Sequence, residues 1–254
     1  MINELARREM AYRALELAPD ARAEERDLLL SALCLESGVD VLEVGAWDGY
    51  LAEKLSACND VKVTLLDRMP FGAKKLKQLY PRMRVYEGRQ ECMSVRDTTF
   101  DRVAALVALH HIDVLAFMRE ANRVLRQGGR LALVEVGRGS TTAAFLDKQV
   151  GAMRPSGHQG KYLSPGEWVA HLSAAGFGAV AVECRTVHWR FSTMAQAIEY
   201  CRCVFGLEAG SERIQAAIRT LSPTVTDDSV TWKWPLIAVT GTKVRTNDKR
   251  MARS

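Results

Sequence analysis

The chain has 254 residues, of which 48% are hydrophobic and 26% charged, with 18 Gly and 7 Pro. This composition is that of an ordinary globular domain and excludes a disordered, collagen-like or coiled-coil chain. No segment approaches the roughly 18 to 20 consecutive apolar residues of a membrane span, and charges at positions 4 to 9 replace the apolar run of a signal peptide. We therefore expect a cytoplasmic protein.

The formal net charge is +5. The tail 243–254 holds five Lys and Arg against one Asp, so the rest of the chain is close to neutral. We expect this tail to be flexible and the protein to have no nucleic-acid partner. The 6 Cys form no CxxC pair and mostly lie in apolar stretches, which indicates small buried side chains in a reduced compartment and no metal site.

In chain order, the first 37 residues predict two helices broken at Pro19, with Asp20 capping the second and Gly38 ending it. Short Val- and Leu-rich runs then predict buried strands at 39–44, 61–66, 82–86, 102–109 and 130–136. Most are separated by helical patterns. Parallel strands joined by crossover helices bind their ligands at the carboxyl ends of the strands.

The alternation of strands and helices changes after residue 136. A helix-like stretch at 141–151 and a Gly/Pro-rich loop at 153–161 precede a helix that Ser164 and Glu167 open as a capping box. A strand at 179–187, helices at 193–205 and 211–221, and a strand at 232–240 follow. We expect one domain over residues 1–254, with segments 141–163 and 190–230 forming a helical lid over the carboxyl edge of the sheet.

The first strand runs into a glycine-bearing turn, Gly45 to Tyr50, and then a helix. Glycine lets a ligand approach the backbone, and the helix start offers free N–H groups. A dinucleotide fingerprint would need glycine at the third and sixth positions of the turn, where Trp47 and Tyr50 stand, so a nicotinamide oxidoreductase is the weaker alternative. Asp67 ends the second strand, where an acid would bond both hydroxyls of a ribose.

Further motifs follow in order: Thr99-Phe100-Asp101-Arg102-Val103, Leu109-His110-His111-Ile112 and Arg123-Val124-Leu125-Arg126-Gln127-Gly128-Gly129. Over residues 39–136 the chain thus resembles the class I S-adenosylmethionine-dependent methyltransferases. The resemblance implies an α/β fold with a doubly wound, mostly parallel seven-stranded sheet, Rossmann-like, and S-adenosylmethionine as cofactor. It also implies cofactor contacts from Glu43, Gly45, Ala46, Trp47, Gly49, Asp67, Arg68, Gly88, Arg89, Gln90 and Leu106.

Two residues depart from the family pattern. Trp47 replaces the middle glycine of the turn, so the loop must swing outward or lay the indole beside the cofactor. Arg89 stands where the family tends to have an acid that accepts the adenine amino group. Because Arg offers no acceptor, Gln90, Glu91 or a backbone carbonyl must accept instead. These departures keep open a second reading, a non-catalytic binding or partner subunit of the same fold.

The acceptor side is expected near three histidines. His110 and His111 follow the fourth strand and should point in opposite directions, with His110 toward the ligand, and His158 lies in the glycine-spaced loop of the lid. Each is a candidate base or substrate contact, and each could instead bond locally. Glu135, Tyr162, Trp189 and Phe191 are candidate substrate-binding residues that could equally serve packing. We expect methyl transfer to a small or medium-sized acceptor, with the methylated atom and the oligomeric state left open.

Overall fold

The computed structural model describes residues 4–58 and 60–244. Within them the strands form one sheet in the order β3-β2-β1-β4-β5-β8-β6, and β7 pairs with β8. The first five strands are parallel, and β8 runs antiparallel to both of its neighbours. The strands are β1 (Asp40–Val44), β2 (Lys62–Asp67), β3 (Arg84–Glu87), β4 (Phe100–Leu106), β5 (Leu125–Glu135), β6 (Phe177–Phe191), β7 (Thr224–Val225) and β8 (Val230–Lys243).

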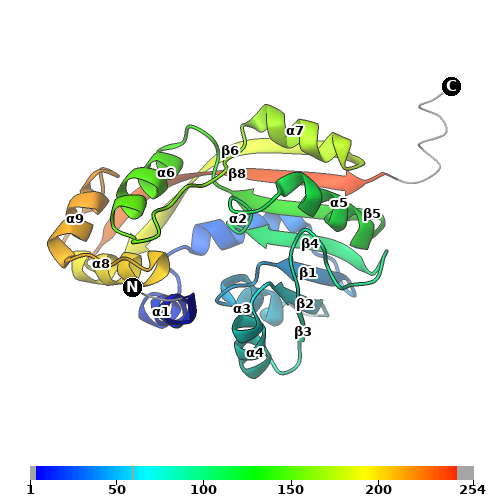
Figure 1. Cartoon of the computed structure of the whole chain (residues 1–254), viewed down its shortest axis with the longest axis horizontal. Coiled ribbons are helices and arrows are strands. Elements are labelled where there is room, and N and C mark those ends of the chain that lie inside the picture. The colour runs from blue at the N-terminus through cyan, green and yellow to red at the C-terminus, as the bar shows by residue number, and fades with distance from the viewer. Residues whose placement is uncertain (1–3, 59, 245–254) are drawn as a thin grey trace.

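Helices cover both faces of this sheet (Figure 1). They are α1 (Glu4–Leu17), α2 (Ala23–Leu33), α3 (Tyr50–Ala57), α4 (Pro70–Leu79), α5 (Val114–Val124), α6 (Thr141–Ala144), the π-helical turn η1 (Phe145–Val150), α7 (Pro165–Ala174), α8 (Met194–Phe205) and α9 (Ser211–Arg219). The predicted capping box at the start of α7 is confirmed, because Ser164 and Glu167 each accept from the other's backbone N–H. The mostly parallel, doubly wound α/β fold is likewise confirmed.

The central strands are apolar on both faces because each face has its own core. In β1, Val41 packs into one cluster and Leu42 into the other, and in β2 Leu65 and Leu66 divide in the same way. This alternation follows from the two-residue period of a strand. Burial on both sides explains why these strands are rich in Val and Leu.

The carboxyl ends of the parallel strands meet at one side of the molecule. Figure 1 shows α1, α6, α8 and α9 gathered there, at the left of the view, and α1 packs along α8. The expected lid segments 141–163 and 190–230 therefore stand beside this edge, joined by α1. The glycine turn after β1 and the loops after β2 and β4 open toward the same place.

The N-terminal helix boundaries differ from the prediction. The second helix begins after Arg22, and Asp20 bonds the guanidinium of Arg26 instead of capping the helix. The helix ends at Cys34, whose left-handed φ of 48° stops it four residues before Gly38. The ion pair of Asp20 with Arg26 replaces the expected cap at the start of the helix, and the left-handed backbone of Cys34 replaces Gly38 at its end.

The predicted bounds of two other parts of the fold were also wrong. The α5 helix ends at Val124, and β5 starts at Leu125 because Leu125 pairs with Phe100 ahead of the Gly128-Gly129 turn. The segment His188 to Phe191, expected to follow the sixth strand, belongs to β6, since it pairs with β8 from Lys233 to Val230. Pairing with a long neighbour extends a strand beyond what its own residues indicate.

The cysteine prediction was right only in part. Cys201 and Cys203 are buried on α8, whereas Cys34, Cys92 and Cys184 are exposed, because they occupy a helix end, a loop and an outward strand position. All six thiols are free.

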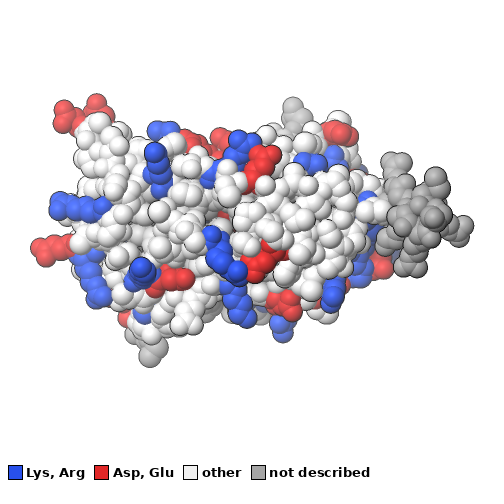
Figure 2. Space-filling view, turned by 90° about the horizontal axis from the view of Figure 1, so that it is seen from above, with Lys and Arg blue, Asp and Glu red and all other residues white. Residues whose placement is uncertain are grey.

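Across the described range, none of the helices combines the length and apolarity that crossing a membrane requires. Figure 2 shows Lys and Arg interspersed with Asp and Glu over the face in view, in keeping with the near-neutral body expected from the sequence. The basic tail expected to be flexible lies, from residue 245 onward, outside the described residues.

Candidate functional site

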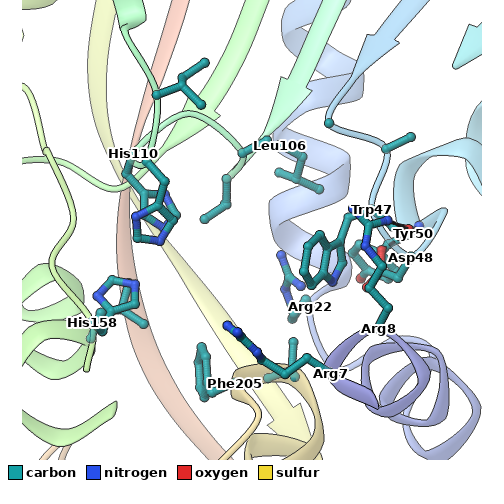
Figure 3. A pocket seen from close by; sticks show the side chains of 18 of the residues that line it. Arg7, Arg8, Arg22, Trp47, Asp48, Tyr50, Leu106, His110, His158 and Phe205 are labelled. Carbon is teal, nitrogen blue, oxygen red and sulfur yellow. Dashed lines mark hydrogen bonds between the residues drawn. The ribbon is translucent and has the colours of Figure 1, made fainter. Parts of the chain in front are cut away.

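A cavity of about 530 Å³ opens at the carboxyl ends of β1, β2 and β4. In Figure 3, Trp47 and Arg8 form one wall and His110 and His158 the other, with Arg7 and Phe205 between them. The walls thus come from the sheet, from α1 and from the predicted lid. A volume of this size suits a small-molecule site at the switch point of an α/β sheet.

The turn after β1 is tightly constrained. Gly45 has φ 72° and Gly49 has φ 81°, while Trp47 takes the left-handed region as a non-glycine residue at φ 44°. A Cβ on Gly45 would come within 2.7 Å of the Cβ of Ala108, so only glycine fits between β1 and the loop after β4. The N–H groups of Gly45 and Ala46 both bond the carbonyl of Leu66, which holds the turn against β2.

The carboxylate of Asp67 is already fully hydrogen-bonded. Arg8 from α1 donates to both oxygens at 2.9 and 2.8 Å, and the N–H groups of Trp47 and Met69 donate at 3.1 and 2.8 Å. Both partners of the ion pair are 2% exposed. The Arg8 guanidinium also stacks on the indole of Trp47, 4.3 Å from its centroid. The indole therefore faces Arg8 at the rim of the site.

Three buried side-chain oxygens of the cavity lining have no hydrogen-bond partner. They are Oη of Tyr50, Oε1 of Gln90 and Oε2 of Glu43. Burial, together with nearby Asp48 and Asp67, raises the pKa of Glu43 well above its usual value. Unpaired buried polar atoms are rare in folded proteins, and here all three oxygens border the cavity.

The three histidines form one cluster. The ring centroids of His110 and His111 lie 4.3 Å apart, and those of His111 and His158 lie 4.9 Å apart. The prediction that His110 and His111 point oppositely was wrong, because β4 ends at Leu106 and both residues belong to the following loop. Strand alternation therefore does not apply to them.

Buried Glu135 orients His110. Its Oε1 lies 3.0 Å from Nδ1 of His110, and it also accepts from two backbone N–H groups. Burial lowers the pKa of His110, but the charge and hydrogen bond of Glu135 outweigh that effect and raise it. Burial and the neighbouring histidines lower the pKa of His111 to about 4, so its ring is neutral at pH 7.

Asp147 of η1 fastens the lid loop. Its Oδ1 lies 3.1 Å from Nδ1 of His158, accepts from the hydroxyl of Tyr162 at 3.1 Å, and accepts from the N–H of Gly160 at 3.2 Å. Burial lowers the pKa of His158 despite that hydrogen bond. A π-helical turn is often found at functional sites, and here it carries the residue that positions His158.

The far wall is aromatic. Trp189 stacks on Phe205 with ring planes 9° apart and lies 4.6 Å from Trp234, and all three line the cavity. The guanidinium of Arg22 is 5.4 Å from the Trp189 ring. This wall offers flat apolar surface beside positive charge.

Twelve of the residues singled out from the sequence line the cavity together. They are Glu43, Gly45, Ala46, Trp47, Asp67, Arg68, Gln90, Leu106, His110, His111, His158 and Trp189.

The other predicted residues lie behind the cavity wall or away from it. Gly49 caps α3 against Tyr80, Phe191 packs on Trp232, and Arg89 is exposed and paired with Glu91. Gly88 approaches Leu66, while Glu135 and Tyr162 support the histidine cluster from behind.

Residues that the sequence left unassigned complete the walls. Arg7, Arg8 and Arg22 come from the N-terminal segment, Arg154 from the lid loop, and Phe205 and Trp234 from α8 and β8. Arg8 and Asp67 are 59 positions apart, and no local pattern connects them. The sequence showed only that the segment of α1 is rich in charged residues, without indicating their partners.

Fold and cavity define a Rossmann-like α/β protein with a small-molecule site at its switch point. Residues 42–133 match the family described as "Methyltransferase domain". The YcgJ protein of Bacillus subtilis is similar in structure, with TM-score 0.65 and 21% identity, and the match covers 88% of this chain and 100% of that one.

Two curated relatives match part of the chain. The uncharacterised protein YafE of Escherichia coli is 34% identical over 105 residues, covering 41% of this chain and 48% of YafE. The 27-O-demethylrifamycin SV methyltransferase of Amycolatopsis mediterranei is 30% identical over 167 residues, covering 54% of this chain and 60% of that protein. The chain thus matches about half of the length of each relative. Of these two relatives, the Amycolatopsis protein is named as a methyltransferase.

Proposed function

We propose that this protein transfers a methyl group from S-adenosylmethionine to a small or medium-sized acceptor. The observation that carries the proposal is the cavity itself. A glycine turn at the end of β1 faces two buried, unpaired side-chain oxygens, on Glu43 and Gln90, beside the superfamily's cofactor edge of the sheet. The methyltransferase domain match over residues 42–133 and the name of the rifamycin relative support the same activity.

The polar residues fit the cofactor. Gln90 Oε1 is free to accept the adenine amino group, which the exposed Arg89 could not do. Glu43 Oε2 is free to accept a donor from the methionine part. Asp67 would accept hydrogen bonds from the ribose hydroxyls once its ion pair with Arg8 breaks. Arg68 and Leu106 line the same cavity. Bound there, S-adenosylmethionine supplies an activated methyl group on a sulfonium.

The histidine cluster and the aromatic wall would then hold the acceptor. We assign cofactor binding to residues 39–136 and coverage of the acceptor to segments 141–163 and 190–230, which supply His158 and Phe205 to the cavity. Methyl transfer is an in-line displacement, so the chain must orient the nucleophile and, where it carries a proton, remove that proton. Neutral His111 and carboxylate-oriented His110 suit that task.

One observation favours a second function, a binding or partner subunit without turnover. Arg8 saturates Asp67, and in a protein that never binds the cofactor this ion pair would be permanent. A nicotinamide oxidoreductase has less support, because Trp47 and Tyr50 occupy positions that a dinucleotide turn needs as glycine.

Calorimetric titration with S-adenosylhomocysteine tests the proposal. We expect saturable binding by the wild-type protein and about tenfold weaker binding by Gln90→Leu, since one hydrogen bond contributes about 1.4 kcal/mol. Gln127→Leu, at an exposed position of β5, is the matched control and should bind like the wild type. Absence of binding to the wild type would favour the partner subunit, and binding of NAD in its place would favour the oxidoreductase.

A further inference from the structure

His110, His111 and His158 place one ring nitrogen each within 4.8 Å of the others. Zinc–imidazole bonds of about 2.0–2.1 Å put tetrahedral nitrogen ligands about 3.4 Å apart. The nitrogen–nitrogen distances therefore need to shorten by at most about 1.4 Å, which side-chain rotation can supply. His111 is exposed and His158 stands on a loop, so both can make that movement.

Two of the three rings carry the second contact that metal-binding histidines usually have. Nδ1 of His110 faces the Glu135 carboxylate at 3.0 Å, and Nδ1 of His158 faces Asp147 at 3.1 Å. A carboxylate accepts the Nδ1 proton, which leaves the Nε2 lone pair of each ring for another partner. Carboxylate–histidine pairs of this kind orient a ligand ring and raise its basicity.

All three histidines also line the cavity. Figure 3 shows His110 and His158 facing one another from different elements, across the cavity from Trp47. Three imidazoles supply no negative charge, so a bound dication would keep its charge toward the open side. Zinc sites that act on substrates use three protein ligands and leave one position for water or substrate.

The geometry points to a three-histidine site for a divalent transition metal of the zinc type, formed by His110, His111 and His158, whose open position binds a hydroxyl group of the acceptor. The metal site stands on the side-chain geometry alone, and it departs from the absence of a metal that the cysteine pattern led us to expect. Binding of the acceptor hydroxyl at the open position rests on the proposed function.

At such a site the acceptor would be an alcohol, enol or phenol. Its oxygen coordinates the metal, and the O–H proton passes to a water molecule of the solvent, because the dication lowers the pKa of a bound hydroxyl. The oxygen lone pair then forms the bond to the methyl carbon. The carbon–sulfur bond breaks, its electron pair stays on sulfur, and neutral S-adenosylhomocysteine leaves.

Cobalt(II) is a suitable probe, because its visible absorption reports the number and type of ligands. We expect the full chain, first freed of metal with a chelator, to bind one Co²⁺ with the spectrum of a nitrogen-ligated four-coordinate site and without a thiolate charge-transfer band. Added Zn²⁺ should displace it. Azide should change the spectrum if one position is open to the cavity, and an unchanged spectrum would overturn the assignment of that position to the acceptor.

Variants identify the ligands. His111→Ala and His158→Ala should each lower Co²⁺ affinity about 100-fold or more, and Asp147→Ala should lower it about 10- to 100-fold. His171→Ala is the matched control, because His171 lies on α7 outside the cavity lining and bonds the carbonyl of Glu167. His111 is exposed, so its variant should fold.

Absence of stoichiometric Co²⁺ binding, or equal binding by the wild type and both histidine variants, would overturn the metal site. The titration with S-adenosylhomocysteine separates this result from the proposed function. Cofactor binding without Co²⁺ binding would leave the methyltransferase proposal standing, and Co²⁺ binding without cofactor binding would leave the metal site standing.

Discussion

Arg8 and Asp67 form a buried, two-pronged ion pair that links the N-terminal helix to the tip of β2. The pair occupies the carboxylate on which the expected ribose contact depends. If Asp67 binds the cofactor as proposed, cofactor binding and docking of α1 compete for this one carboxylate.

We expect Arg8→Ala to lower stability and to strengthen cofactor binding. Removing one partner of a buried ion pair costs about 3–5 kcal/mol, equivalent to a Tm decrease of about 6 °C or more. The ribose would no longer compete with a guanidinium, so S-adenosylhomocysteine should raise the Tm of the variant by more than that of the wild type. Arg13→Ala, an exposed position of the same helix, is the control. Equal or weaker ligand stabilisation in Arg8→Ala would show that the ion pair persists in the complex.

Asp67→Ala should weaken binding of S-adenosylmethionine about 10- to 100-fold, since hydrogen bonds to a charged group contribute about 1.5–3 kcal/mol. From the sequence alone we would expect an intact fold. The structure predicts a destabilised one, because Arg8 and the N–H groups of Trp47 and Met69 all lose their acceptor. Titration calorimetry and thermal unfolding measure the two effects separately, and unchanged affinity in the folded variant would remove Asp67 from the cofactor site.

Gly49→Ala should destabilise the fold more than it affects the cavity. Gly49 has φ 81°, and its added Cβ would lie 2.7 Å from the ring of Tyr80. Gly139 has a similar φ of 76° with nothing within 4 Å, so Gly139→Ala isolates the backbone cost, about 1–2 kcal/mol. Denaturant unfolding should show a larger loss for Gly49→Ala, and Tyr80→Ala should restore part of it. Equal losses at the two glycines would contradict the steric explanation.

Glu43→Gln should stabilise the cofactor-free protein above about pH 5. Burial raises the pKa of Glu43, so the folded state holds this proton more tightly than the unfolded state, whose value is about 4.3. Wild-type stability from this group is therefore lost as the pH rises from about 4.3 toward the folded-state pKa. The Tm difference between variant and wild type should grow from pH 4.5 to pH 8, and Glu212→Gln, at an exposed position of α9, is the control. A pH-independent difference would mean that Glu43 titrates normally.

Asp147→Ala should loosen the lid loop. The Asp147 carboxylate accepts from Gly160 and Tyr162 and bonds His158, so its loss removes three contacts between η1 and the loop. Limited trypsin digestion should cut faster at Arg154 and Lys161, with little change in Tm. Asp228→Ala, at an exposed turn position, should digest like the wild type. An unchanged cleavage rate would show that the loop is held elsewhere, for example by the bond from Lys161 N–H to the His110 carbonyl.

The fold class and the edge of the sheet that carries the cavity could both be predicted from the sequence. Strands buried on both faces require continuous apolar runs, as in Leu131 to Val134, and a turn pressed against Ala108 requires glycine at position 45. Such constraints act over a few residues, so they leave a local pattern. The capping box at Ser164 is visible for the same reason.

The partner of Asp67 and the contacts among the three histidines could not be predicted from the sequence. Arg8 reaches Asp67 across 59 positions. His110 lies in the loop after β4 and His158 in the lid loop, and the bond from Lys161 N–H to the His110 carbonyl joins these two loops. Contacts between distant segments depend on how whole elements pack, and no spacing within the chain records them. Short runs of residues therefore predict the strands of the sheet. The contacts in the cavity depend on side chains that are far apart in the sequence, so local patterns do not predict them.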